Sequence, residues 1–160
     1  MIKKSDLKKN DFMQFLTDEM LEKIIPITKV MEVESREIIF NEGDLAEHFY
    51  LVKSGQVLLE QKISKDILVN ISAINAGEAF GLSVLLHRDQ RAMAAICNEA
   101  ATLIMIHRND LLNLMEQDHT MGYLIMKYAA KVLHRRWIKR TEQFLRALKS
   151  HPDISALDVM

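Results

Sequence analysis

The 160-residue chain has few of the residues that cross-link or interrupt a fold: one cysteine, two prolines and five glycines. A single cysteine, Cys97, excludes an internal disulfide and is typical of proteins from the reducing cytoplasm. No apolar run approaches the length of a membrane-spanning helix, and Met1–Asp6 leads into charged residues instead of the apolar core of a signal peptide. We therefore expect a soluble, cytoplasmic protein that has no membrane partner.

The groupings that usually carry catalysis are missing as well. There is no nucleophile paired with a base, no Walker-type loop and no dinucleotide fingerprint. The six histidines show no close pair of the kind that metal-binding jelly rolls use, and a haem held by Cys97 or His87 would lack its second axial ligand. They are His48, His87, His107, His119, His134 and His151. We expect no enzyme, no metal and no resident cofactor.

What is present is a soluble, single-domain composition, with 49% hydrophobic and 27% charged residues. Thr17 is a good helix cap with acids behind it, and Pro26 ends the apolar helical pattern that follows. The expected organisation is N-terminal helices over residues 1–26, strands and turns over 27–107, helices over 108–149, and a tail over 150–160.

The middle of the chain alternates short β-rich segments with turns, which favours a jelly roll or a sandwich. The predicted strands are Ile27–Val33, Glu37–Phe40, His48–Val52, Gln56–Gln61, Ile67–Ile74, Ala92–Cys97 and Thr102–His107. The predicted turns are Asn41–Asp44, Lys53–Gly55, Ser64–Asp66 and Asn75–Gly77. Alternating apolar residues from Ile67 to Ala73 indicate a half-buried strand.

Two helices are predicted after the strands, a short one over Arg108–Gln117 and a long one over His119–Lys149. The long helix would reach roughly 45 Å, more than a domain of this size needs. Its apolar residues recur at three-, four- and seven-residue steps and form a stripe that we call the seam: Met126, Ala130, Leu133, Trp137, Phe144 and Leu148. Such a stripe favours a homodimer. Packing along the chain's own strands would explain the wider first half, which adds Ile125, Tyr128 and Val132, but leaves the second half uncovered.

Charge is unevenly distributed along the chain. Lys127–Lys149 contains eight basic residues and one acid, Glu142, which gives +7; the whole chain carries −1, so the rest carries −8. This segment suits an acidic partner or self-association with the acidic body, and a solvated basic helix face explains it equally well.

The chain is most organised around Gly77 and Gly81, two glycines that bracket Phe80. Leu82–Leu86 is long enough for one or two helical turns, and a single arginine, Arg91, follows a polar loop. Turn, short helix and arginine together indicate an anion cradle. The alternative is a surface loop with a solvated arginine.

The order of elements resembles the cyclic-nucleotide-binding domain of catabolite-activator-type bacterial regulators and of the regulatory subunits of cyclic-AMP-dependent kinase. The resemblance runs from about Phe12 to Leu148 and is carried by three glycine motifs: Ile38–Asp44, Phe49–Val57 and Gly77–Gly81. It implies an antiparallel jelly-roll β-roll of about eight strands, mainly β with α, flanked by N-terminal helices and a long C-terminal helix. It also implies a phosphate-binding cassette whose phosphate pairs with Arg91.

The cassette departs from the family pattern at several positions. The family's ribose-binding glutamate is Leu82 here, a usually small residue is Val84, and the frequent hydroxyls after the arginine are replaced by Ala92–Ala94. Ser83 supplies one nearby hydroxyl, and Ala92 would disfavour cyclic GMP, since guanine-preferring members tend to have threonine there. The resemblance places ligand contacts at Phe80, Gly81, Leu82, Ser83, Val84, Arg91, Ala92, Arg136 and Trp137. The lost glutamate predicts weak binding of cyclic AMP.

Arg136 and Trp137 would face the base of a nucleotide, although Trp137 also lies on the seam and suits a dimer contact. No helix-turn-helix segment follows the long helix in this chain, so we expect no sequence-specific DNA binding. Two functions stay open: a sensor of a small anionic effector, cyclic AMP or a relative, signalling to a protein partner, or a degenerate roll that acts as a dimeric interaction module. In a working site Arg91 should point inward and meet an anion or an internal acid, with Glu78 and Asp89 as stand-ins. In a decayed site it should face solvent over a cavity filled by Leu82 and Val84.

Overall fold

A computed structural model of the chain describes residues 1–86 and 89–155. It consists of two compact units, Met1–Met126 and Lys127–Met160, which are treated separately below. The sequence-based consideration of His87 as a haem ligand and the last five residues of the predicted tail lie outside the described residues.

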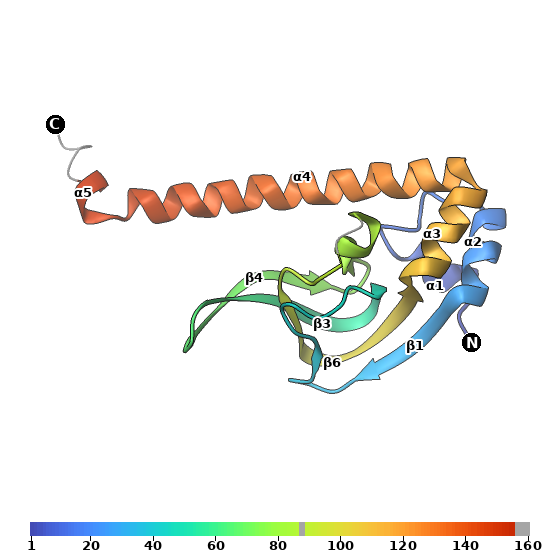
Figure 1. Cartoon of the computed structure of the whole chain (residues 1–160), viewed down its shortest axis with the longest axis horizontal. Helices are drawn as coiled ribbons and strands as arrows, with labels where there is room; N and C mark the ends of the chain where they lie inside the picture. Colours follow the sequence, from blue (N-terminus) through green and yellow to red (C-terminus); the bar gives the residue numbers. More distant parts are fainter. Residues whose placement is uncertain (87–88, 156–160) are drawn as a thin grey trace. The chain divides into compact units, whose positions relative to one another are not determined.

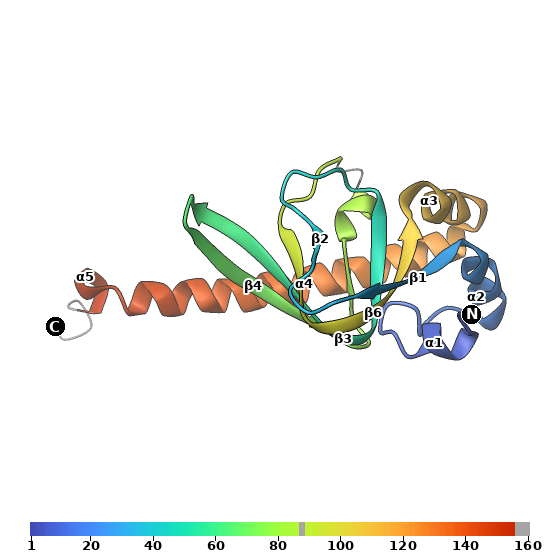
Figure 2. The ribbon, with the colours of Figure 1, turned by 90° about the horizontal axis from the view of Figure 1, so that it is seen from below.

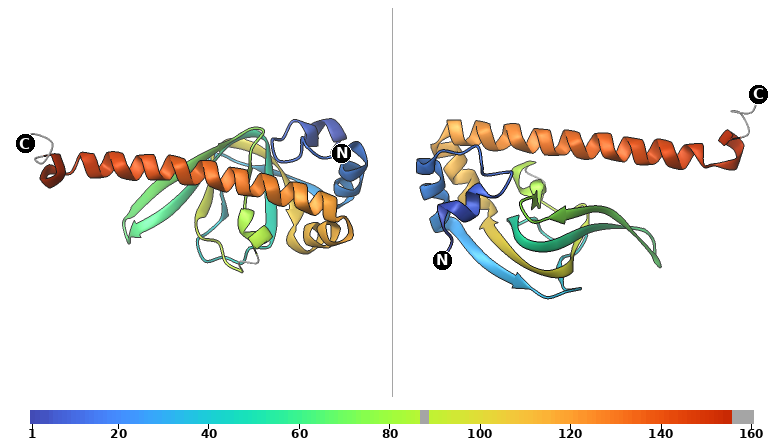
Figure 3. Two further views of the ribbon diagram at one scale, coloured as in Figure 1. Left: turned by 90° about the horizontal axis from the view of Figure 1, so that it is seen from above. Right: turned by 180° about the vertical axis from the view of Figure 1, so that it is seen from behind.

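The first unit is built on one antiparallel sheet (Figure 1). Its strands in the described residues are β1 (Thr28–Val33), β2 (Ile38–Phe40), β3 (His48–Ser64), β4 (Ile67–Asn75), β5 (Ala79–Phe80) and β6 (Ala94–His107). They follow the order β1-β6-β3-β4, with β2 paired to β6 and β5 paired to β3. The β3–β4 hairpin extends beyond the other strands (Figures 2 and 3). The predicted antiparallel β-roll is confirmed.

In the described residues, six strands replace the seven predicted segments, because two predicted pairs are each one continuous strand, β3 and β6, and the short β5 was not predicted. The turn predicted at Lys53–Gly55 is wrong: β3 runs through it, and the register against β6 shifts between Val52 and Val57. Gly55 has φ +81, and a Cβ there would lie 2.4 Å from the carbonyl oxygen of Ala100. The glycine therefore lets two strands bend together in close contact without ending either.

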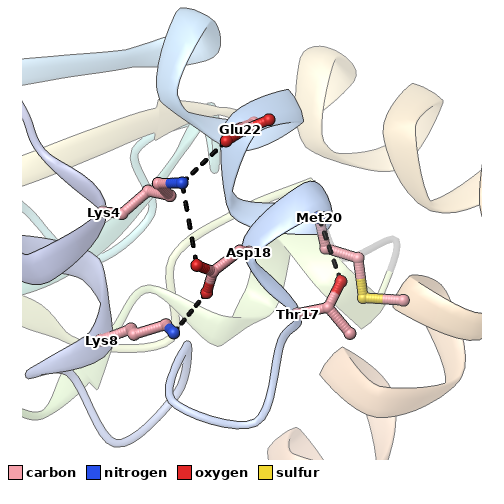
Figure 4. A network of polar contacts seen from close by, with 6 residues as sticks. All are labelled: Lys4, Lys8, Thr17, Asp18, Met20 and Glu22. Atoms are coloured by element: carbon pink, nitrogen blue, oxygen red, sulfur yellow. Dashed lines mark hydrogen bonds and ion pairs between the residues drawn. The ribbon is translucent and has the colours of Figure 1, made fainter.

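The N-terminal segment forms α1 (Lys4–Lys8), α2 (Asp18–Ile24) and the 3₁₀ turn η1 (Ile25–Ile27). Thr17 caps α2 by accepting a hydrogen bond from the Met20 amide at 3.3 Å, as predicted (Figure 4). The Lys4 ammonium lies 2.7 Å from the Glu22 carboxylate and, with Lys8, also pairs with Asp18. These exposed ion pairs tie α1 to α2 and contribute little to stability.

Both predicted C-terminal helices are confirmed, as α3 (Arg108–Gln117) and α4 (His119–Lys149). Asp118 lies between them. Its carboxylate accepts a hydrogen bond from the Met121 amide at 3.0 Å and so caps the start of α4. A four-residue helix, α5 (Pro152–Ser155), follows. Across the described residues, no helix combines the length and apolarity needed to cross a membrane.

The core of the roll is apolar and lies on the inner side of β3 and β6. Tyr50 and Phe80, opposite each other in β3 and β5, stack with their ring centres 4.8 Å apart. Phe80 is fully buried, so the start of the predicted cassette is part of the core.

Candidate functional site

The cassette consists here of Gly77–Leu86 together with Arg91. Gly77 and Gly81 have φ +90 and +78, and between them β5 makes its two-residue pairing with β3. The predicted short helix is confirmed as the 3₁₀ helix η2 (Leu82–Leu86). Two left-handed glycines thus direct the chain into the sheet and out again, which positions η2 beside it.

A buried asparagine that the sequence did not single out fixes the start of the cassette. Asn10 is 3% exposed, and its side-chain amide donates to the Glu78 carbonyl at 2.9 Å. The Asp11 amide donates to the Gly77 carbonyl at 2.7 Å. The N-terminal segment therefore holds the turn at residues 77–78. The Asn10 contact joins residues 68 positions apart, so no local sequence pattern predicts it.

Arg91 points into the roll and is 4% exposed. Its Nη1 donates to the Gly81 carbonyl and the Ser83 hydroxyl, each at 3.3 Å, and its Nη2 donates to the His48 carbonyl at 2.5 Å. A Cβ on residue 81 would lie 3.0 Å from Nη1 and 3.0 Å from the His48 carbonyl oxygen. Gly81 therefore leaves the room that the guanidinium occupies.

The guanidinium is buried without a direct ion pair in the described residues. No ion pair joins Arg91 to a carboxylate in the described part of the chain, and its Nε is buried with no hydrogen-bond partner. The ring of Phe40 lies 4.2 Å from the guanidinium carbon, and that of Tyr50 lies 5.8 Å away. Burial lowers the pKa of Arg91 below its ordinary value, against the opposing influence of Tyr50, Asp44 and Glu47.

Neither Glu78 nor Asp89, the candidate internal stand-ins for an anion, pairs with Arg91. The Glu78 carboxylate accepts hydrogen bonds from the Asn75 amide at 2.8 Å and the Asn75 side chain at 3.3 Å. Asp89 pairs with Arg108 at 3.2 Å. Both acids therefore have other partners, Glu78 within its own turn and Asp89 on α3.

The other cassette positions combine features of both sequence-based expectations. Leu82 and Val84 are buried, as expected for a decayed site, although Arg91 points inward, as expected for a working one. Ser83 contacts Arg91 directly, and Ala92 is half-buried. The structure therefore brings Phe80, Gly81, Ser83 and Arg91 together, with Leu82 and Val84 on the same short element.

Two histidines form a pair that the sequence analysis missed. His48 and His107 stand opposite each other in β3 and β6, with ring centres 5.2 Å apart in an edge-to-face arrangement. Cross-strand register, invisible in the linear sequence, creates this contact. Burial, followed by the charge of His107, lowers the pKa of His48. No third ligand joins them: across residues 1–86 and 89–155 no group of three or more metal-binding side chains occurs.

Arg136 and Trp137 belong to the second unit, on the continuous helix α4. Arg136 is half-buried, and Trp137 is 72% exposed. Seam residues Leu133, Phe144 and Leu148 are exposed on the same helix, as are Ile138 and Leu145, which the seam did not include.

Comparison with known proteins places these features in a family. Residues 30–118 match the family model of the cyclic nucleotide-binding domain. The cyclic AMP receptor protein of Thermus thermophilus is 33% identical over 79 residues, which is 49% of this chain and 37% of that protein. The chain matches between 6% and 37% of the length of such curated relatives.

Solved structures agree on the fold. A Geobacter metallireducens protein described as cyclic nucleotide-binding has a TM-score of 0.76 at 24% identity, covering 86% of this chain and 99% of that one. The Thermus thermophilus catabolite activator protein has a TM-score of 0.70 at 25% identity, covering 86% and 62%. From the matched motifs, the roll and the cassette with its inward arginine, we conclude that the chain belongs to the cyclic nucleotide-binding domain family.

Proposed function

We propose that this chain is a regulatory, non-catalytic domain that senses a small anionic effector, cyclic AMP or a relative of it, through Arg91. The observation that carries the proposal is the buried guanidinium with an unpartnered Nε and no ion pair in the described residues. A buried cation without an anion costs several kcal/mol. An effector that brings a phosphate or carboxylate to Arg91 would offset that cost, so binding would stabilise the roll.

The proposed effector site comprises Phe80, Gly81, Leu82, Ser83, Val84, Arg91 and Ala92. Arg91 donates to the anion, Ser83 adds a hydroxyl, and Gly81 leaves the room that the guanidinium occupies. The kinship with the Thermus thermophilus cyclic AMP receptor protein supports cyclic AMP as the first effector to try.

Thermal unfolding with and without cyclic AMP tests the site. An effector concentration of about a hundred times the dissociation constant stabilises the folded state by about 2.7 kcal/mol. This raises the midpoint temperature of unfolding by several degrees. Arg91→Lys keeps the charge but loses the planar fork, and should abolish the rise. Arg36→Lys, a change in an exposed loop residue, should leave it unchanged. No rise with cyclic AMP or with other small phosphates and carboxylates would contradict the proposal.

The second part of the proposal is a homodimer through the seam of α4. Trp137 and Phe144 are 72% and 62% exposed, and large apolar side chains aligned on one helix face in water favour self-association. The dimer would pass the state of the effector site to a protein partner.

Sedimentation at tens of micromolar protein tests the dimer. Trp137→Glu should shift the chain to the monomer without unfolding the roll, whereas Gln143→Glu, on an exposed polar position of the same helix, should leave the dimer intact. A wild-type monomer at these concentrations would exclude the seam as a dimer interface.

The alternative function is a roll that binds no effector and serves as a dimeric interaction module. The burial of Leu82, Val84 and Leu85 favours it, because these apolar side chains occupy the cassette. It predicts a dimer in sedimentation and no thermal response to any anion, so the two experiments above separate the two functions.

A further inference from the structure

Resting on the proposed function, we propose that the effector is an apolar molecule that carries a carboxylate or phosphate group. We also propose that the site does not recognise sugar hydroxyls. The proposal depends on which donors of Arg91 remain, what surrounds them, and where the nearby acids are engaged.

The donors of Arg91 are partly used. A guanidinium has five N–H groups, one on Nε and two on each Nη. Nη1 makes two hydrogen bonds, to the Gly81 carbonyl and the Ser83 hydroxyl, and Nη2 makes one, to the His48 carbonyl. The two N–H groups outside these three bonds lie on neighbouring nitrogens, Nε and Nη2: the Nε–H has no partner, and the Tyr50 phenol also interacts with the guanidinium. Two such donors suit the paired oxygens of a carboxylate or phosphate.

The surroundings of this fork are apolar and aromatic. Phe40 covers the guanidinium face at 4.2 Å and also contacts the rings of Tyr50 and Phe80. Ile39, Phe40 and Met93 pack against the buried core cluster, while Leu82 and Val84 are buried in η2. A ligand body next to the anion would meet rings and aliphatic side chains.

Three of the acids in the segments that flank Arg91 have other partners, and Glu47, whose charge also acts on Arg91, is exposed. The Asp44 carboxylate accepts from the Asn41 amide at 2.7 Å, Glu78 accepts from Asn75, and Asp89 pairs with Arg108. The Ser83 hydroxyl already accepts from Nη1, which leaves its proton for an oxygen of the anion. The Tyr50 phenol interacts with the guanidinium itself. A sugar hydroxyl held against the buried side chains of Leu82 and Val84 would therefore be desolvated without a carboxylate beside it, which weakens binding roughly tenfold.

Isothermal calorimetry on the full chain tests this with two matched pairs of probes. Phenyl phosphate and ribose 5-phosphate share the phosphate but differ in the body, and cyclic AMP and its 2′-deoxy analogue differ in one hydroxyl. We expect phenyl phosphate to bind at least tenfold more tightly than ribose 5-phosphate, and 2′-deoxy cyclic AMP to bind within twofold of cyclic AMP. Arg91→Lys should abolish the binding of phenyl phosphate, and Arg36→Lys should not.

Ribose 5-phosphate binding as tightly as phenyl phosphate, or cyclic AMP preferred tenfold over its deoxy analogue, would overturn this inference and leave the anion sensor standing. Phenyl phosphate binding that survives Arg91→Lys would also overturn it, because the ligand would then lie elsewhere. If none of the four probes binds, the inference fails; if the small carboxylates of the thermal test fail as well, the proposed function fails with it. Leu82→Glu supplies the missing acceptor and should create a preference for cyclic AMP over the deoxy analogue, whereas Leu86→Glu, at an exposed position of the same short helix, should not.

Discussion

The cassette and the distal half of α4 are opposite departures from the usual distribution of polar and apolar side chains. In the cassette, a charged side chain, Arg91, is 4% exposed among aromatic and aliphatic neighbours. On α4, large apolar side chains such as Trp137 and Phe144 are exposed among basic residues. Globular proteins normally bury large apolar side chains and expose charged ones.

Under the proposed function, the two regions have two different partners. A buried cation is stabilised by an anion, and an exposed apolar seam is stabilised by another apolar surface. The cassette is therefore expected to respond to small charged molecules and to depend on the shape around one guanidinium. The helix is expected to respond to protein concentration and to salt.

The largest expected effect separates the two regions by stability. Phe80→Ala removes a fully buried ring stacked on Tyr50 and should cost about 3–5 kcal/mol of unfolding free energy. Trp137→Ala removes an exposed ring and should change the stability of the monomer by no more than about 0.5 kcal/mol. Urea denaturation at submicromolar protein measures both. Equal losses would mean that α4 is packed in the monomer.

The next effect concerns space around the guanidinium. Gly81→Ala should cost about 1–3 kcal/mol, because φ +78 disfavours alanine and the new Cβ would crowd Arg91 and the His48 carbonyl. Effector binding should be lost with it. Gly43→Ala is the matched control: its φ is +87, but nothing lies within 4 Å of the added Cβ. It should cost about 1–2 kcal/mol and retain binding. Calorimetry with cyclic AMP distinguishes the two variants, and retained binding in Gly81→Ala would contradict the assigned role of this glycine.

A smaller effect is expected on the dimer. Residues 127–149 carry +7, so two such helices repel each other in low salt, and the Debye length shortens to about 10 Å at 0.1 M and about 3 Å at 1 M. Sedimentation should therefore show a dimer that tightens severalfold between low and high salt. A dimer that weakens with salt would indicate an interface held by attraction between charges instead of the seam.

The smallest effect is a dependence of stability on pH. The pKa of His48 is lowered, chiefly by burial and then by His107, so the folded chain binds a proton less readily than the unfolded chain. Stability should be constant above the ordinary pKa of about 6.5 and should fall as the pH drops below it. His48→Gln should flatten this dependence, and His119→Gln, at an exposed position, should not. Thermal midpoints from pH 7.5 to pH 5 measure it; a parallel fall in wild type and His48→Gln would assign the effect to other groups.

Sequence reasoning located the regular elements well, because their signals are local. Apolar spacing located α3 and α4, and Thr17 located the start of α2. It failed where the outcome depends on a distant backbone. Gly55 was predicted to lie in a turn, but β3 continues through it, paired with β6 in a shifted register.

The site shows the same limit. Its glycines and Arg91 were predicted as one constellation, but the acceptors of the guanidinium include the carbonyls of Gly81 and His48, and any residue supplies a carbonyl. Sequence reasoning instead named Glu78 and Asp89 as partners of Arg91, because only side-chain acceptors can be identified from a sequence. Asn10 was missed for a similar reason, since its partner is the backbone of Glu78.

The most direct test of the central claim is the nuclear magnetic resonance signal of the Arg91 Nε–H group during titration with phenyl phosphate and with cyclic AMP. The signal is assigned by its absence from Arg91→Lys. Because Nε is buried and unpartnered without effector, an anion that accepts its hydrogen bond should shift the proton signal downfield in a saturable way, with the dissociation constant that calorimetry gives. An Arg91 signal that stays unchanged while the ligand binds would contradict the account.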